Sequence, residues 1–190
     1  MPKSIHSRLY YPARSAALLL AFGLMITGCS MPEVDPMATT SDTDSAASEP
    51  EITLSGPGQL LPVSAIAQIT TQSGEVQLDL EVARTRQQQA LGLMFRSSLP
   101  DNRGMLFPFG QPRPASFWMK DVPVPLDMVF LRDLEVIEIV AEAAPCPELP
   151  CPSYGPEDEL IDQVIELRGG RAAEIGLQAG DRVTIEDITP

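Results

Sequence analysis

Hydrophobic and polar residues alternate strictly along residues 75–84, "EVQLDLEVAR". One side of this segment carries the apolar residues Val76, Leu78, Leu80 and Val82, and the other carries Glu75, Gln77, Asp79 and Glu81. A period of two is typical of a strand with one buried face and one face in water. Residues 64–70, "SAIAQIT", predict its hairpin partner, because Gly74 in the connecting "TQSGE" permits a turn.

The period changes after this hairpin, and residues 85–94, "TRQQQALGLM", predict a short helix. Thr85 followed by Gln88 matches a capping box, in which each side chain satisfies a free backbone N–H of the first turn. Ala90, Leu91 and Met94 form one apolar stripe, and Gly92 weakens the last turn.

The rest of the chain consists of short apolar runs separated by turn residues. Strands are predicted in residues 104–109 and 115–120, in two parts of 125–143 joined at 132–134, in 160–170, and after a turn at 180–181. A helix is predicted in residues 170–177, ended by Gly176. Many short strands with only two short helices predict a single, mainly β domain, either a β-sandwich of jelly-roll-like form or a barrel-like fold.

The first 28 residues predict a signal peptide rather than part of the fold. Lys3, Arg8 and Arg14 precede an apolar run at residues 16–26, which is shorter than the ~20 residues that span a bilayer. The run ends in "ITGC", which resembles the lipobox of bacterial lipoproteins and implies a lipid on Cys29. We therefore expect an exported protein anchored to the bacterial envelope, with its domain facing the periplasm or the exterior. Ser30 weakly favours the outer membrane.

Residues 29–60 contain six acidic residues, no lysine or arginine, and scattered apolar positions without a period. This composition predicts a disordered acidic tether. The remaining residues, 61–190, are enough for one globular domain with a single core.

Charge and histidine content exclude several classes of function. The domain carries 20 acidic and 10 basic residues, so nucleic acid is not an expected partner. The only histidine, His6, lies in the signal peptide, which excludes catalytic triads and the usual histidine metal sites from the mature domain. No catalytic residue, metal site or cofactor is assigned from the sequence.

Two cysteines remain beside Cys29, in "PCPELPC". Because exported proteins enter an oxidising compartment, we expect Cys146 and Cys151 to form a disulfide that restrains a proline-rich loop. A redox-active or metal-binding pair is the alternative, and the four-residue spacing does not favour it.

The segment 117–130, "FWMKDVPVPLDMVF", contains the only tryptophan and is the candidate site. If residues 115–120 alternate like a strand, Ala115, Phe117 and Met119 face the core, whereas Ser116, Trp118 and Lys120 share the other side. In residues 126–131 the same rule leaves Asp127 partly buried, so its carboxylate needs a partner, and Lys120 and Arg96 are the candidates. The prediction is a pocket formed by Arg96, Trp118, Lys120 and Asp127; the alternative is a structural ion pair under a core ring.

Four regions of the chain together resemble the family known as domain of unknown function 192. They are "EVARTRQQQALGLMFRSSLPDNRGMLFPF", "FWMKDVPVPLDMVFL", "PCPELPCPSYG" and "VIELRGGRAAEIGLQAGDRV", and they cover nearly all of residues 75–184. The resemblance implies a mainly β fold and a secreted or lipid-anchored protein, but no reaction.

Three functions follow from these observations, together with a metal-binding alternative. The leading one is a lipid-anchored binding or accessory module for a small polar or anionic ligand, held by the cations Arg96 and Lys120 and the Trp118 ring. The others are a carboxylate enzyme using Asp127 and a structural partner of another envelope protein. The metal-binding alternative is a Cu(I)-binding protein using Met94, Met105, Met119 and Met128.

Overall fold

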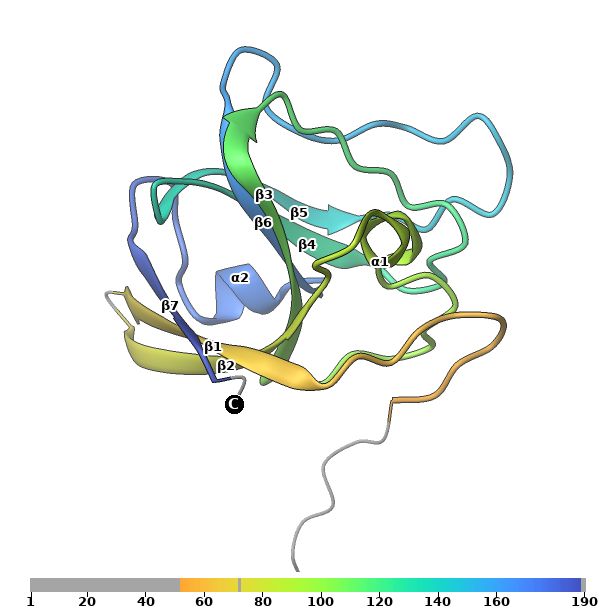
Figure 1. Ribbon diagram of the computed structural model, residues 1–190, viewed down its shortest axis with the longest axis horizontal. Coiled ribbons are helices and arrows are strands. Elements are labelled where there is room, and N and C mark those ends of the chain that lie inside the picture. The colour runs from red at the N-terminus through yellow and green to blue at the C-terminus, as the bar shows by residue number, and fades with distance from the viewer. Residues whose placement is uncertain (1–51, 72, 189–190) are drawn as a thin grey trace, which may run out of the picture. The chain divides into compact units, whose positions relative to one another are not determined.

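The computed structural model describes residues 52–71 and 73–188. Seven strands and two short helices follow one another along this part of the chain (Figure 1). The elements are β1 (Val63–Thr71), β2 (Gly74–Val82), α1 (Arg86–Leu91), β3 (Arg103–Arg113), β4 (Leu126–Arg132), β5 (Glu135–Ala143), β6 (Ile161–Arg168), α2 (Arg171–Glu174) and β7 (Val183–Asp187). The mainly β fold with two short helices is therefore confirmed.

All seven strands belong to one sheet, in the order β5-β4-β6-β3-β2-β1-β7. Only the pair β2–β3 is parallel, and α1 lies in the connection between these two strands. In the described residues the edge strands β5 and β7 approach each other through one bridge, Glu135 to Arg182. The sheet is strongly curved but not closed into a barrel (Figure 1).

Each face of the sheet carries its own hydrophobic core. On the concave face, α2 lies in the hollow of the sheet and buries Ala172 and Ile175 among strand residues such as Leu80, Val129 and Leu167 (Figure 1). The opposite face is covered by α1 and by long loops, with a core that includes Met105, Phe107, Met119, Met128 and Phe130. Because both faces of the sheet are covered, most of the central strands carry apolar side chains on both sides.

Two loop segments are joined on this second face. The backbones of Phe117 and Tyr154 exchange two hydrogen bonds, each 2.8 Å long, and Cys146 N–H donates to Met119 C=O. Cys146 and Cys151 form a disulfide, as expected, and close the loop that packs on residues 117–120. The loop therefore fixes the position of the segment that carries Trp118.

The sequence patterns predict most elements within a few residues. The capping box of α1 is present: Gln88 N–H donates to Thr85 Oγ1 at 3.2 Å, and Thr85 N–H donates to Gln88 Oε1 at 2.9 Å. The alternation in residues 115–120 is also confirmed, although this segment forms isolated bridges instead of a strand. One expectation is wrong: Glu81, assigned to the solvent face of β2, is 1% exposed.

Residues 1–51, with the predicted signal peptide, Cys29 and most of the tether, lie outside the described residues. Within the described part, no helix has the length and apolar character needed to span a membrane.

Candidate functional site

Asp127 is fully buried on β4, and its carboxylate binds backbone rather than a cation. It accepts hydrogen bonds from three backbone N–H groups: Glu142 at 2.8 Å, Gly170 at 2.9 Å and Ala172 at 2.7 Å. Two of these donors belong to the start of α2, so Asp127 joins the helix and β5 to the centre of the sheet. The predicted pairing of Asp127 with Lys120 or Arg96 is wrong, because backbone donors already satisfy the carboxylate.

Arg96 is also buried, with 1% of its surface exposed, and it forms an ion pair with Glu81 of β2. The pair is bidentate, with Arg96 Nη1 to Glu81 Oε1 at 2.8 Å and Arg96 Nη2 to Glu81 Oε2 at 2.6 Å. Arg96 Nη2 also donates to the Gln59 carbonyl at 2.9 Å. The guanidinium is therefore held both by β2 and by the segment that precedes β1. This geometry suits a structural ion pair between the sheet and the loop after α1.

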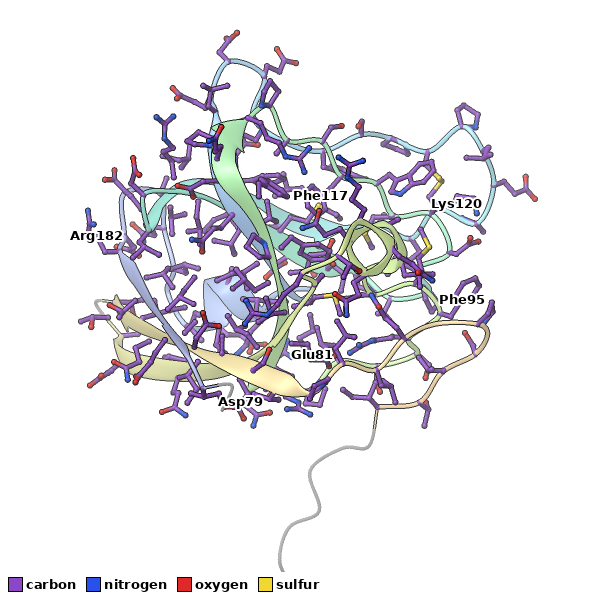
Figure 2. All side chains as sticks on the ribbon, viewed as in Figure 1. Asp79, Glu81, Phe95, Phe117, Lys120 and Arg182 are labelled. Atoms are coloured by element: carbon purple, nitrogen blue, oxygen red, sulfur yellow. A yellow bond between two sulfur atoms is a disulfide. The ribbon has the colours of Figure 1, made fainter. Side chains whose placement is uncertain are left out.

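Trp118 and Lys120 lie on the loop segment at the surface. The Trp118 side chain is 48% exposed, which makes it one of the most exposed large apolar residues of the described chain. The ammonium of Lys120 pairs with the neighbouring Asp121, and Figure 2 shows Lys120 among the loops, away from Glu81 on the sheet.

The structure therefore does not bring the four predicted residues into one pocket. The pocket beside Trp118 is not lined by Arg96, Lys120 or Asp127. Instead, Asp127 holds α2 on the concave face, and Arg96 is occupied by Glu81 on the opposite face. Of the four, only Trp118 borders the candidate site described next.

The candidate site contains a carboxylate that the sequence patterns do not single out, Glu166 of β6. Glu166 pairs in register with Met105 of β3 and Met128 of β4, and its side chain lies on the α1 face. It is 5% exposed, and within the described chain its carboxyl group has neither a hydrogen-bond partner nor an ion pair. Burial raises the pKa of Glu166 from 4.5 to about 8, and the positive charge of Arg96 opposes this shift.

A small pocket of about 30 Å³ opens onto Glu166. Its lining consists of Gln89, Ala90, Leu91, Gly92, Leu93, Met94, Phe107, Phe117, Trp118, Val122 and Glu166. Phe117 packs edge-on against Phe107, with ring centroids 5.2 Å apart. The pocket is thus an apolar, aromatic slot whose single ionisable group is Glu166, and it has room for one or two water-sized groups.

Local chain geometry shapes this slot. Gly92 ends α1 with φ at 47°, in the left-handed region, and its N–H donates to the Gln88 carbonyl at 2.8 Å. A Cβ at position 92 would meet the Phe107 ring at 3.4 Å. A glycine here therefore lets the helix end turn sharply next to the aromatic wall.

The sequence does contain a signal for Glu166. Residues 160–170 match a predicted strand, and alternation puts Glu166 on the same side as Val164, which is buried. The same reasoning that marks Asp127 as a buried carboxylate on a doubly covered strand applies to Glu166. Only the tertiary fold shows which of the two finds hydrogen-bond donors.

The four methionines have packing roles. Met105, Met119 and Met128 are 0% exposed within the core of the α1 face, and Met94 packs against the same core and lines the slot. Packing in this core is a sufficient reason for methionine at these four positions.

A family model described as "Uncharacterized ACR", the domain of unknown function 192 (DUF192), matches residues 67–185. This match covers more than half of the chain, and the protein belongs to this family. Among curated proteins none matches this chain.

Two solved structures are similar. One, described as a "putative transcription regulator" from Sinorhizobium meliloti, is 32% identical, covers 67% of this chain and 97% of its own, and has a TM-score of 0.59. The other, described as a protein of unknown function from Novosphingobium aromaticivorans, is 36% identical, covers 68% of this chain and 94% of its own, and has a TM-score of 0.58. Both matches cover the folded domain, and neither description names a ligand or a reaction.

Proposed function

We propose that the protein is a binding module of the cell envelope, and that the slot above Glu166 holds the cationic end of a small organic ligand. The observation that carries this proposal is the Glu166 carboxyl group: the residue is only 5% exposed, its carboxyl group has no hydrogen-bond partner among the described residues, and it opens onto the slot. A carboxyl group in such an apolar setting has little solvation from the protein, so a ligand that supplies a donor there gains affinity.

The remaining walls suit an organic cation. Aromatic faces attract cations, and Trp118 and Phe117 line the slot together with aliphatic side chains. The slot has the volume of an ammonium or methylammonium group and not of a whole ring. The anionic ligand expected from the sequence is not favoured, because the two cations proposed to bind it already have partners. Arg96 is paired with Glu81 and Lys120 with Asp121.

Binding is favoured over catalysis by the composition of the slot. Glu166 is its only ionisable side chain, and no hydroxyl or thiol lines it to act as a nucleophile. Asp127, the acid or base of the alternative enzyme, already accepts three backbone hydrogen bonds on the other face. A role in DNA binding is not favoured either, because the chain has a net charge of −13.

Attachment to the envelope is part of the proposal and is supported by the sequence alone. The "ITGC" stretch ending at Cys29 resembles a lipobox, and the acidic residues 29–60 suit a tether. Labelling with radioactive palmitate should mark the wild-type protein in membranes. Cys29→Ser should abolish the label and release the protein; a label that persists in this variant contradicts lipidation of Cys29.

The proposed site has a built-in reporter, because Trp118 is the only tryptophan of the chain. Titration with butylammonium should change the Trp118 fluorescence in a saturable way, whereas butanol, which lacks the charge, should not. Because the cation prefers the ionised carboxylate, its affinity should rise as pH increases toward about 8 and level off above it.

Glu166→Gln keeps the size of the side chain and removes its charge. This variant should lose butylammonium binding, while Glu186→Gln, which removes an exposed carboxylate on β7, should bind like the wild type. Equal responses to butylammonium and butanol, or unchanged binding in Glu166→Gln, would contradict the proposal.

A further inference from the structure

A second groove also borders α1 and is lined by cations instead of a carboxyl group. We define the arginine groove as the surface lined by Arg84, Arg86, Gln89, Pro108, Phe109 and Arg113. Its volume is about 580 Å³, far larger than the Glu166 slot, and no carboxylate lines it. Three guanidinium groups thus share one hollow in a chain whose net charge is −13.

Two of these arginines differ from nearly all other cations of the described chain. Seven of its ten lysine and arginine side chains form ion pairs with carboxylates. The three that do not are Arg86, Arg103 and Arg113, and two of them line the arginine groove. Arg84, the third arginine of the groove, pairs with Asp187 at 2.6 Å, but Asp187 belongs to the neighbouring hollow. Because Arg86 and Arg113 line one groove without a carboxylate partner, their positive charge favours an anion there.

The frame that carries the groove is fixed by hydrogen bonds. Gln89 Nε2 donates to the carbonyls of Ala83 at 3.1 Å and Pro108 at 2.9 Å, which ties α1 to the residue after β2 and to the middle of β3. The Arg84 N–H donates to Gln88 Oε1 at 2.9 Å. The Arg113 guanidinium lies 3.9 Å from the centre of the Phe109 ring, which orders its side chain while its edge N–H groups stay available.

From this arrangement we infer that the arginine groove is an anion site for a ligand carrying a phosphate group. A guanidinium binds two phosphate oxygens at once, and a phosphate monoester carries a charge of about −1.5 to −2 at neutral pH. This charge matches Arg86 and Arg113, which have no carboxylate partner, whereas a single carboxylate would neutralise only one of them. The inference does not depend on the Glu166 slot, since the two hollows share only Gln89.

The test uses the mature sequence from residue 29 with Cys29→Ser, so that neither the signal peptide nor a lipid anchor can bind vesicles by itself. Phenyl phosphate is titrated by calorimetry at constant ionic strength. The double variant Arg86→Gln/Arg113→Gln should weaken its binding by about tenfold or more, because both bidentate partners are removed. Arg103→Gln removes the third unpaired arginine, outside the groove, and should change the affinity little.

A second arm distinguishes the source of the phosphate. Co-sedimentation with phosphatidylglycerol vesicles that requires Arg86 and Arg113 supports the inference and assigns the site to lipid headgroups. Binding of phenyl phosphate without vesicle binding supports it and assigns the site to a soluble ligand.

The inference is overturned if neither probe binds, or if Arg103→Gln weakens binding as much as the double variant, since that result indicates a general charge effect. Glu166→Gln should leave phosphate binding unchanged, so a failure of the Glu166 slot and a failure of this site can be told apart.

Discussion

Two buried carboxylates lie side by side in this sheet and have opposite environments. Asp127 of β4 is in register with Leu167 of β6, and Glu166 is in register with Met128, one position away on each strand. Because neighbouring positions of a strand point to opposite faces, Asp127 lies under α2 and Glu166 lies under α1. Their exposed fractions, 0% and 5%, are nearly the same.

The difference lies in hydrogen-bond donors. Three backbone N–H groups surround Asp127, two of them from the start of α2, whereas the described residues offer Glu166 none. Burial alone therefore does not mark a functional carboxylate. A functional carboxylate is marked by three features together: burial, the absence of hydrogen-bond donors around it, and an opening to solvent. Of these two carboxylates, Glu166 has all three.

The largest expected effect comes from the third buried carboxylate, Glu81, which is paired with Arg96. Arg96→Met would leave Glu81 buried without its cation and should reduce the free energy of unfolding by about 3–5 kcal/mol, measured by urea denaturation. The double variant Arg96→Met/Glu81→Gln should recover part of this loss. Equal stability of the single and double variants would show that the pair does not act as a unit.

Asp127→Asn should also destabilise, by about 2–4 kcal/mol, because one of the two acceptor oxygens becomes an N–H₂ group facing backbone donors. Butylammonium binding should persist in this variant where it remains folded. Asp121→Asn, which alters a partly exposed carboxylate paired with Lys120, is the matched control and should cost little. Loss of ligand response in a folded Asp127→Asn protein would contradict a purely structural role.

Glu166→Gln should have the opposite effect on stability and increase the free energy of unfolding. The folded protein keeps the Glu166 proton up to about pH 8, while the unfolded chain releases it near 4.5, so the wild type loses stability as pH rises between these values. Replacing the carboxyl by an amide removes this dependence and should stabilise the domain by about 1–3 kcal/mol at pH 8. Thermal unfolding at pH 5 and pH 8 checks it; the same pH dependence in both proteins would exclude Glu166 as its source.

The smallest effect is expected from the disulfide. Its loop is short, so replacing Cys146 and Cys151 by serine should cost about 2 kcal/mol or less in unfolding free energy. Because this loop packs on residues 117–120, the change should nevertheless alter the Trp118 fluorescence and weaken butylammonium binding. An unchanged emission spectrum would show that the loop does not position Trp118.

Sequence patterns predict the elements far better than the site, for physical reasons. The alternation in β2 up to Leu80, the capping box of α1 and the turn between β4 and β5 are local signals, and the structure confirms them. The partner of Asp127 depends on α2, some 45 residues later in the chain, and the partner of Arg96 depends on β2. Such contacts follow from strand order, which local patterns do not specify.

The most direct test of the central claim is the titration of Glu166 itself by carbon-13 NMR of glutamate carboxyl groups, assigned with Glu166→Gln. We expect one resonance, missing in the variant, to titrate with a pKa of about 8, and butylammonium to lower that pKa. A Glu166 resonance that titrates near 4.5, like an exposed glutamate, or that does not respond to butylammonium, would contradict the account.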